Sequence, residues 1–124
     1  AEFNRMITDQ LQSAAIEVLE TTNEPYKVMR VPGAVELPIT VQHAIRNQKP
    51  DAVIALGCVI KGGTDHYDFV LRSCIDGLGR VSLDEGVPVI QGVLACHRFS
   101  DAWQRRFLGK DYAETALKMK KIMK

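Results

Sequence analysis

The sequence has few cysteines, almost no net charge and no long apolar run, and each shortage excludes a class of protein. The three cysteines are an odd number with no Cys-x-x-Cys spacing, which argues against a disulfide framework and a zinc site. The formal net charge of +1 gives no electrostatic reason to expect a nucleic acid or a membrane as partner. No apolar run approaches the roughly 20 residues of a membrane span, and no segment resembles a signal peptide. We therefore expect a cytoplasmic protein.

The composition that is present is that of an ordinary globular chain. Of the 124 residues, 46% are hydrophobic and 25% are charged. A chain of this length can bury a core without disulfides or metals. We expect residues 1–124 to form one domain.

Helical and strand-like patterns alternate along the chain. Apolar residues at helical spacing predict helices over about 7–19, 37–45, 65–83, 101–106 and 112–123. Apolar runs bounded by turn residues predict strands over 26–31, 52–56 and 87–94. This alternation predicts a three-layer αβα fold with a parallel sheet. Three strands are few for such a sheet, so we expect a first strand upstream of Ala1 or a neighbouring subunit over the free edge.

The segment from Asp51 to His66 is the most informative one. A buried strand ends at Gly62-Gly63, and Thr64 and His66 follow where a helix begins. Unpaired backbone N–H groups and the helix dipole favour an anion at such a point. The Gly-Lys-Ser/Thr ending of a P-loop is missing. The plainer interpretations are a turn at the glycines, a helix cap at Thr64 and a surface histidine, whereas the functional one is a phosphate site with a neutral imidazole as general base.

Other candidates also lie near predicted strand ends. In open parallel sheets ligands bind beyond the carboxyl ends of the strands. Arg105-Arg106 is either a solvated helix end or a guanidinium clamp on phosphate. Glu36 either caps a helix or holds ligand hydroxyl groups, and Cys58 is either a buried small residue or part of the site.

Three motifs in this order resemble the 6,7-dimethyl-8-ribityllumazine synthase family. They are Val-Pro-Gly-Ala-x-Glu at 31–36, Gly-Gly-Thr-x-His-Tyr-Asp at 62–68 and Pro-Val-Ile-Gln-Gly-Val-Leu at 88–94. Phe3-Asn4 and residues 113–117 are also similar to that family, so the resemblance covers almost the whole chain. It implies a flavodoxin-like αβα fold.

The resemblance implies a transferase that acts without metal or organic cofactor. Its reaction condenses 5-amino-6-(D-ribitylamino)uracil with 3,4-dihydroxy-2-butanone 4-phosphate and gives the lumazine, phosphate and water in riboflavin biosynthesis. Position by position, the resemblance assigns phosphate to Gly63, Thr64 and Arg105 and proton transfer to His66. It assigns substrate binding to Phe3, Asn4, Ala34, Val35, Glu36, Cys58, Val59, Ile60, Gln91 and Lys110.

The resemblance further implies a homo-oligomer in which Arg105 serves a neighbour's site, and it leaves a riboflavin synthase open as a partner. The chain departs from the family pattern at Val35 and Gln91, where many relatives have aromatic residues. The loop at 106–111 is shortened, which favours a pentamer or a dimer of pentamers over a sixty-subunit shell, and Lys110 stands near the family's lysine. Two alternatives stay open: an archaeal-type riboflavin synthase, and a non-catalytic flavin- or lumazine-binding or assembly homologue.

Overall fold

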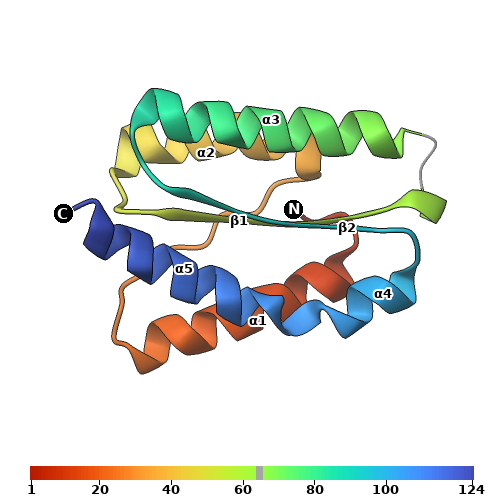
Figure 1. Ribbon diagram of the computed structural model, residues 1–124, viewed down its shortest axis with the longest axis horizontal. Helices are drawn as coiled ribbons and strands as arrows, with labels where there is room; N and C mark the ends of the chain where they lie inside the picture. The colour runs from red at the N-terminus through yellow and green to blue at the C-terminus, as the bar shows by residue number, and fades with distance from the viewer. Residues whose placement is uncertain (64–65) are drawn as a thin grey trace.

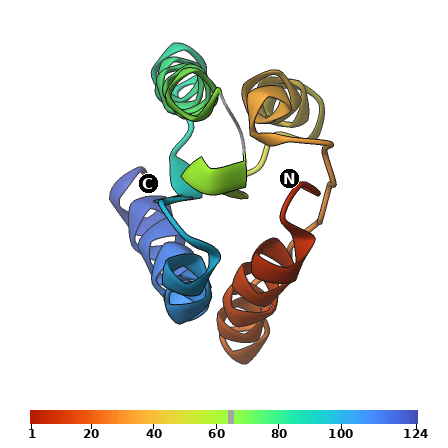
Figure 2. The same cartoon turned by 90° about the vertical axis from the view of Figure 1, so that its right-hand side faces the viewer.

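Two layers of helices enclose a parallel sheet in the computed structural model, which describes residues 1–63 and 66–124 (Figure 1). One layer consists of α2 (Leu37–Gln48) and α3 (Tyr67–Glu85). The other consists of α1 (Arg5–Thr21), α4 (Phe99–Gln104) and α5 (Gly109–Ile122). The view along the strands shows the sheet between these layers (Figure 2). Short 3-10 turns, η1 to η3, cover Ala34–Glu36, Lys61–Gly63 and Arg106–Leu108.

The sheet pairs β1 (Val53–Ile60) with β2 (Val89–Cys96) in parallel. The register joins Val53 to Val89 at one end and Ile60 to Cys96 at the other. A parallel pair needs a long crossover, and α3 supplies it. Side chains alternate between the faces, so both strands are apolar almost throughout, as expected of strands covered by helices on both sides.

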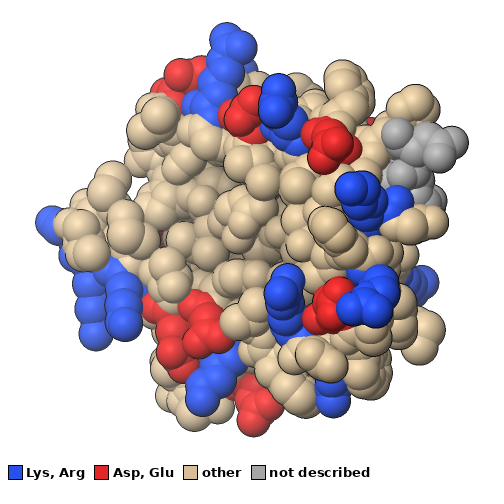
Figure 3. Space-filling view, turned by 45° about the vertical axis from the view of Figure 1, so that its right-hand side comes forward, with Lys and Arg blue, Asp and Glu red and all other residues tan. Residues whose placement is uncertain are grey.

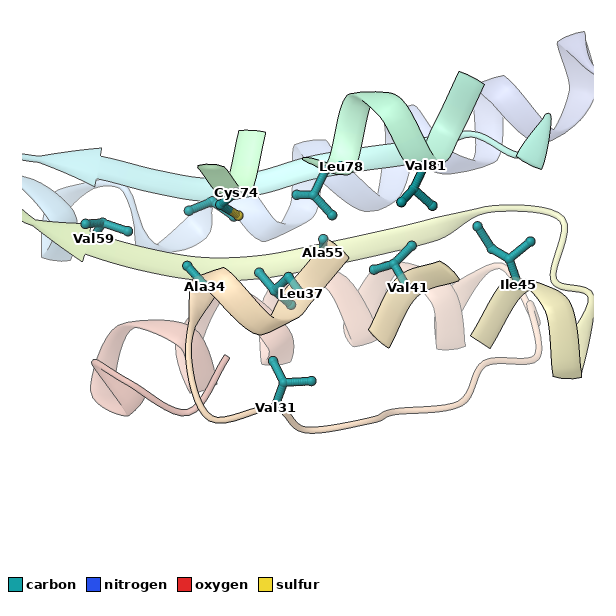
Figure 4. Close-up of a cluster of buried hydrophobic side chains, with 11 residues drawn as sticks. Val31, Ala34, Leu37, Val41, Ile45, Ala55, Val59, Cys74, Leu78 and Val81 are labelled. Atoms are coloured by element: carbon teal, nitrogen blue, oxygen red, sulfur yellow. The ribbon is translucent and has the colours of Figure 1, made fainter. Parts of the chain in front are cut away.

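Each face of the sheet has its own buried cluster. On the α2–α3 face, Val59 and Ala55 of β1 meet side chains from both helices (Figure 4). On the other face, Cys58 and Cys96 pack with Ile7 and Leu11 of α1, which are fully buried. The two clusters together anchor every helix against the sheet and so fix where the strand ends lie.

Close backbone approaches set the helix spacing within each layer. A Cβ at Gly77 of α3 would lie 2.6 Å from Cγ of Pro38, and a Cβ at Gly109 of α5 would lie 2.0 Å from the carbonyl oxygen of Leu11. Pro38 is tolerated because it falls in the first turn of α2. Glycine at 77 and 109 therefore allows α3 to contact α2 and α5 to contact α1 at short range.

The predicted αβα class is confirmed, and each predicted helix occurs within a few residues of its expected bounds. The predicted strand at 26–31 is wrong, because no strand is assigned there and the sheet within the described residues has two strands. The segment is extended, yet its only backbone bonds to the N-terminal residues run from Glu2 N to the Val31 oxygen (2.6 Å) and from Phe3 N to the Pro32 oxygen (3.0 Å). A strand requires a partner ladder, which this segment lacks.

Within the described part of the chain, no helix combines the length and apolar character needed to cross a membrane.

Candidate functional site at the carboxyl edge of the sheet

The carboxyl ends of β1 and β2 lie at one end of the molecule, and the segments with predicted site residues gather around them (Figure 1). Residues 3–4 precede α1, η1 precedes α2, and η2 follows β1 directly. The start of α3 and the whole of α4 complete this edge. The predicted convergence at the strand ends is therefore present.

Asn4 connects the start of α1 to the end of β1. Its Nδ2 donates to the Cys58 carbonyl at 2.8 Å, across 54 residues of sequence. Its backbone is left-handed, with φ 61° and ψ 46°, and its carbonyl accepts from Ile7 N and Thr8 N. Asparagine tolerates this conformation better than most residues. Asn4 therefore ties the backbone of residues 3–4 to the end of β1, while the Phe3 side chain is exposed.

The end of β1 offers backbone rather than side chains to a ligand. Cys58 and Val59 are buried on opposite faces of the sheet. Burial raises the pKa of the Cys58 thiol to about 11, so it is not a thiolate nucleophile near neutral pH. In the parallel ladder, Val53 N bonds to the Pro88 oxygen, so odd-numbered residues face β2 with their amides. The backbone of Ile60 thus points away from β2, to the side of Asn4.

His66 lies beyond η2 as the residue that precedes α3, and its side chain is exposed. Its carbonyl accepts from Val70 N at 2.9 Å, which places the imidazole at the amino end of a 19-residue helix. Tyr67 meets His97 from the end of β2 edge to face, with ring centroids 6.4 Å apart. Burial raises the pKa of the Tyr67 hydroxyl. Gly63 ends η2, whereas Thr64 is outside the described residues.

The two adjacent arginines after α4 have different surroundings. Arg106 packs over the rings of Trp103 and Phe107, 4.1 and 4.3 Å from their centroids, and donates to the Trp103 carbonyl at 2.7 Å. Arg105 instead directs Nη1 to the Cys96 sulfur at 3.5 Å, at the carboxyl end of β2. Of the pair, only Arg105 is placed to contact a ligand at the strand ends.

Arg105 borders a cavity of about 600 Å³ at the end of β2. Its lining also includes His97, Arg98 and Asp101. Arg98 and Asp101 form an ion pair at 3.8 Å, so one cation is neutralised locally. The sequence analysis did not identify Arg98 or Asp101 as site residues. Their position just after the end of a predicted strand could have marked them as candidates. The cavity suits a small anionic group held by guanidinium.

The turn η1 brings three predicted residues to the same edge. Ala34 is buried against the cluster on the α2–α3 face, close to Val59 (Figure 4). Val35 and Glu36 are exposed. Glu36 occupies the N-cap position of α2, as the capping interpretation predicts, but its side chain makes no cap hydrogen bond. The Glu36 carboxylate therefore remains available to a ligand.

Gln91 does not join these residues, and Lys110 lies on the surface of α5. Gln91 lies opposite Ala55 in the register, five positions before Cys96, and a strand rises about 16 Å over that length. Its Nε2 donates to the Val93 carbonyl at 3.2 Å. Lys110 lies in the first turn of α5, exposed and 4.0 Å from Glu114. Within one chain, Gln91 therefore does not reach the edge described above.

Left of the centre of Figure 3, charged side chains surround an uncharged area that lies beside the carboxyl edge of the sheet and not over it. Figure 3 shows Lys, Arg, Asp and Glu around a broad hollowed surface without charged side chains. Within residues 1–63 and 66–124, no three His, Cys, Asp or Glu side chains gather in a way that could hold a metal ion.

Comparisons with known proteins agree on one family. The family model described as 6,7-dimethyl-8-ribityllumazine synthase matches residues 1–124. A 6,7-dimethyl-8-ribityllumazine synthase of Thermococcus kodakarensis is 39% identical over 129 aligned residues, which cover 100% of this chain and 83% of the relative. Another, of Edwardsiella ictaluri, is 40% identical over 133 residues and covers 100% of this chain and 85% of the relative.

Proposed function

Because the chain belongs to the 6,7-dimethyl-8-ribityllumazine synthase family, we propose that the carboxyl edge of its sheet carries out the condensation of that family. The reaction joins 5-amino-6-(D-ribitylamino)uracil to 3,4-dihydroxy-2-butanone 4-phosphate in riboflavin biosynthesis. The observation that carries the assignment of the site is the convergence of Asn4, Glu36 and His66 at the carboxyl edge of the sheet. These residues are far apart in sequence.

The phosphate is held between η2 and a guanidinium. Gly63, with Thr64 after it, lies where the chain passes from β1 toward α3, and the amino end of a long helix favours an anion. Arg105 of each chain supplies the planar fork that suits phosphate oxygens to the site of a neighbouring subunit. Loss of inorganic phosphate breaks a C–O bond, and the same groups stabilise the negative charge that the leaving oxygen gains.

The pyrimidine rests between Phe3 and the end of β1. The exposed ring of Phe3 offers a stacking surface, and backbone groups of 58–60 offer donors and acceptors to the edge of the heterocycle. Asn4 fixes the distance between these two parts through its bond to the Cys58 carbonyl. The ribityl hydroxyl groups lie along η1, where the backbone of 34–35 and the carboxylate of Glu36 accept hydrogen bonds.

His66 moves the protons. Imine formation between the uracil amine and the ketone requires a proton to leave nitrogen and a water to leave carbon. Ring closure by the ribitylamino nitrogen releases a second water in the same way. A neutral imidazole accepts the nitrogen proton and returns it to the departing hydroxyl. Holding both substrates together also lowers the barrier, by up to about 7–11 kcal/mol in favourable cases.

The active unit is a homo-oligomer, with a neighbour's residues completing each site. Large apolar side chains are exposed on both layers, among them Leu83 at 86% and Phe69 at 71% on α3 and Ile122 at 71% on α5. A surface of that kind marks a protein interface. Gln91, which lies away from the edge of its own chain, would reach a site only across such an interface, and we assign the exposed Lys110 to the same interface. A riboflavin synthase partner and a cytoplasmic location stay predictions.

The test follows lumazine formation by absorbance after the two substrates are mixed with protein. We expect a rate well above the uncatalysed one, reduced about 100-fold or more in His66→Ala. His43→Ala is the matched control, because His43 is an exposed histidine on α2 that contacts Asn47 and should keep the parent rate. Equal rates for His66→Ala and the parent, or no rate above background, would overturn the proposal.

A further inference from the structure

His97 is the first residue after β2, and at this end of the molecule β1 passes into η2 (Figure 1). The last pair in the parallel register joins Ile60 to Cys96, so His97 lies one residue beyond the ladder. A Cβ at Gly62 would lie 3.8 Å from the His97 carbonyl oxygen, an ordinary van der Waals distance. The backbone of His97 therefore lies next to η2, the turn that ends with the proposed phosphate residue Gly63.

The His97 ring contacts the first residue of α3. Its centroid lies 6.4 Å from that of Tyr67 and the two planes are inclined by 86°, so the rings meet edge to face. Aromatic pairs favour this arrangement because the positive edge of one ring faces the negative face of the other. Tyr67 also packs against the buried cluster on the α2–α3 face of the sheet. The Tyr67 ring is therefore held both by the core and by His97.

Tyr67 directly follows His66, so its contact with His97 affects the imidazole that we propose moves protons. The His66 carbonyl accepts from Val70 N at 2.9 Å, which ties the backbone of His66 to the first turn of α3. A group that transfers a proton must lie within hydrogen-bond reach of the reacting atom. A misplacement of about 1 Å can reduce the rate about 100-fold. The contact that fixes the start of α3 therefore also fixes the reach of His66.

We propose that His97 is a positioning residue, which holds η2 and the start of α3 at the end of β2 and so places the His66 imidazole for proton transfer. This role rests on the function proposed above. It also separates two adjacent positions of the chain. Cys96 contacts Arg105, which we assign to a neighbour's site, whereas His97 acts on the site of its own chain.

The kinetic test compares His97→Ala, which removes the ring, with His97→Phe, which keeps an aromatic edge next to Tyr67. We expect kcat to fall about tenfold or more in His97→Ala and to stay within about threefold of the parent in His97→Phe. The KM for the uracil substrate should stay within about twofold, because Phe3 and the end of β1 are unchanged. His43→Ala, which removes another exposed imidazole, is the matched control. A parent kcat in His97→Ala, or an equal loss in His97→Phe, overturns the proposal.

Amide hydrogen exchange needs no turnover, so it separates a failure of this inference from a failure of the proposed function. In His97→Ala the amide of Val70, which closes the first turn of α3, should exchange at least about threefold faster. The amides of α2 should keep the parent rate, and His97→Phe should restore the protection of Val70. Unchanged exchange at Val70, or faster exchange throughout the molecule, overturns the proposal.

Mixed subunits test whether His97 acts within its own chain. His97→Ala combined with Arg105→Ala should recover about a quarter of the parent rate on random mixing, because the intact edge of one variant then borders the intact Arg105 of the other. His97→Ala combined with His66→Ala should show no gain over the separate variants, since each chain then has a defect at its own edge. The reverse pattern would place His97 in the neighbour's site and overturn the proposal.

Discussion

At the scale of single residues, Asn4 combines two functions that a different side chain would separate. Its left-handed backbone starts α1, and its amide holds the end of β1. Glycine keeps the first property and loses the second, whereas alanine loses both. The position thus allows backbone strain and hydrogen bonding to be measured independently.

We expect Asn4→Gly to lower the free energy of unfolding by about 1 kcal/mol, the value of one hydrogen bond. Asn4→Ala should lower it by about 1 kcal/mol more, because alanine is strained at φ 61°. Urea unfolding measures both. The steady-state KM for the uracil substrate should rise in both variants, since Phe3 and β1 are no longer held together. Equal stability of the two variants would contradict the strain argument.

Two buried thiols predict how stability depends on alkaline pH. Burial raises the pKa of Cys58 and of Cys74 from the ordinary 9.0 to about 11. Between these values the unfolded thiols lose protons that the folded ones keep, so the unfolded state binds fewer protons. The stabilisation is full below pH 9 and is lost as the pH rises toward 11.

The expected fall is up to about 1.4 kcal/mol per pH unit for each thiol. Urea unfolding at pH 8, 9 and 10 measures it. In the Cys58→Ala, Cys74→Ala double variant, which is less stable at pH 8, the fall should be much shallower. An unchanged slope in that variant would assign the pH dependence to other groups, such as Tyr112, whose pKa burial also raises.

At the scale of elements, α3 contains two glycines with opposite surroundings. A Cβ at Gly77 would lie 2.6 and 2.9 Å from atoms of Pro38, whereas a Cβ at Gly79 would meet nothing within 4 Å. Gly77→Ala should therefore cost about 1–3 kcal/mol through overpacking against α2. Gly79→Ala should stabilise by about 0.5–1 kcal/mol, because alanine favours a helix. Thermal unfolding of both variants measures these changes in stability. A loss of stability in both variants would contradict the argument from the close approach of Gly77 to Pro38.

The positions of the helices could be predicted well from nearby residues in the sequence. Apolar spacing and Pro38 located α2, and Glu85-Gly86 located the end of α3, where Gly86 is left-handed at φ 68°. These signals lie within a few residues of the feature that they predict. The strands β1 and β2 were found too, because runs buried on both faces are continuous in sequence.

The predicted strand at 26–31 was wrong because a strand depends on a partner that is distant in sequence. Its residues are extended and have strand propensity, yet a strand exists only where a neighbour completes the ladder, and the next element in space is the short stretch 1–3. The site was predictable to a similar degree. The sequence motifs predicted that Asn4, His66 and Arg105 lie near the strand ends. The separation of Gln91 from that edge depends on the strand register, which the sequence alone does not contain.

At the scale of the whole molecule, the proposal that Arg105 serves a neighbour's site has a direct test. Arg105→Ala and His66→Ala should each be inactive when pure. Mixed subunits should recover activity, because a site with both residues intact forms where one variant borders the other, in about a quarter of positions for random mixing. Lumazine absorbance of the reassembled mixture measures this. The mixture of Arg105→Ala with an Arg105→Ala, His66→Ala double variant is the control that should stay inactive, and no recovery at all would place Arg105 in its own site.

Every residue proposed to contact substrate within a chain lies at one end of the sheet, and the turns at 49–52 and 86–88 lie at the other (Figure 1). The length of the two strands thus separates the end of the molecule that holds the proposed site residues from the end that holds these turns. Changes of loop length, attached labels or fused peptides at the turn containing Gly86 would leave the reacting groups undisturbed. Insertions, labels or fused peptides can therefore be accommodated at that turn, whether they arise in evolution or by design.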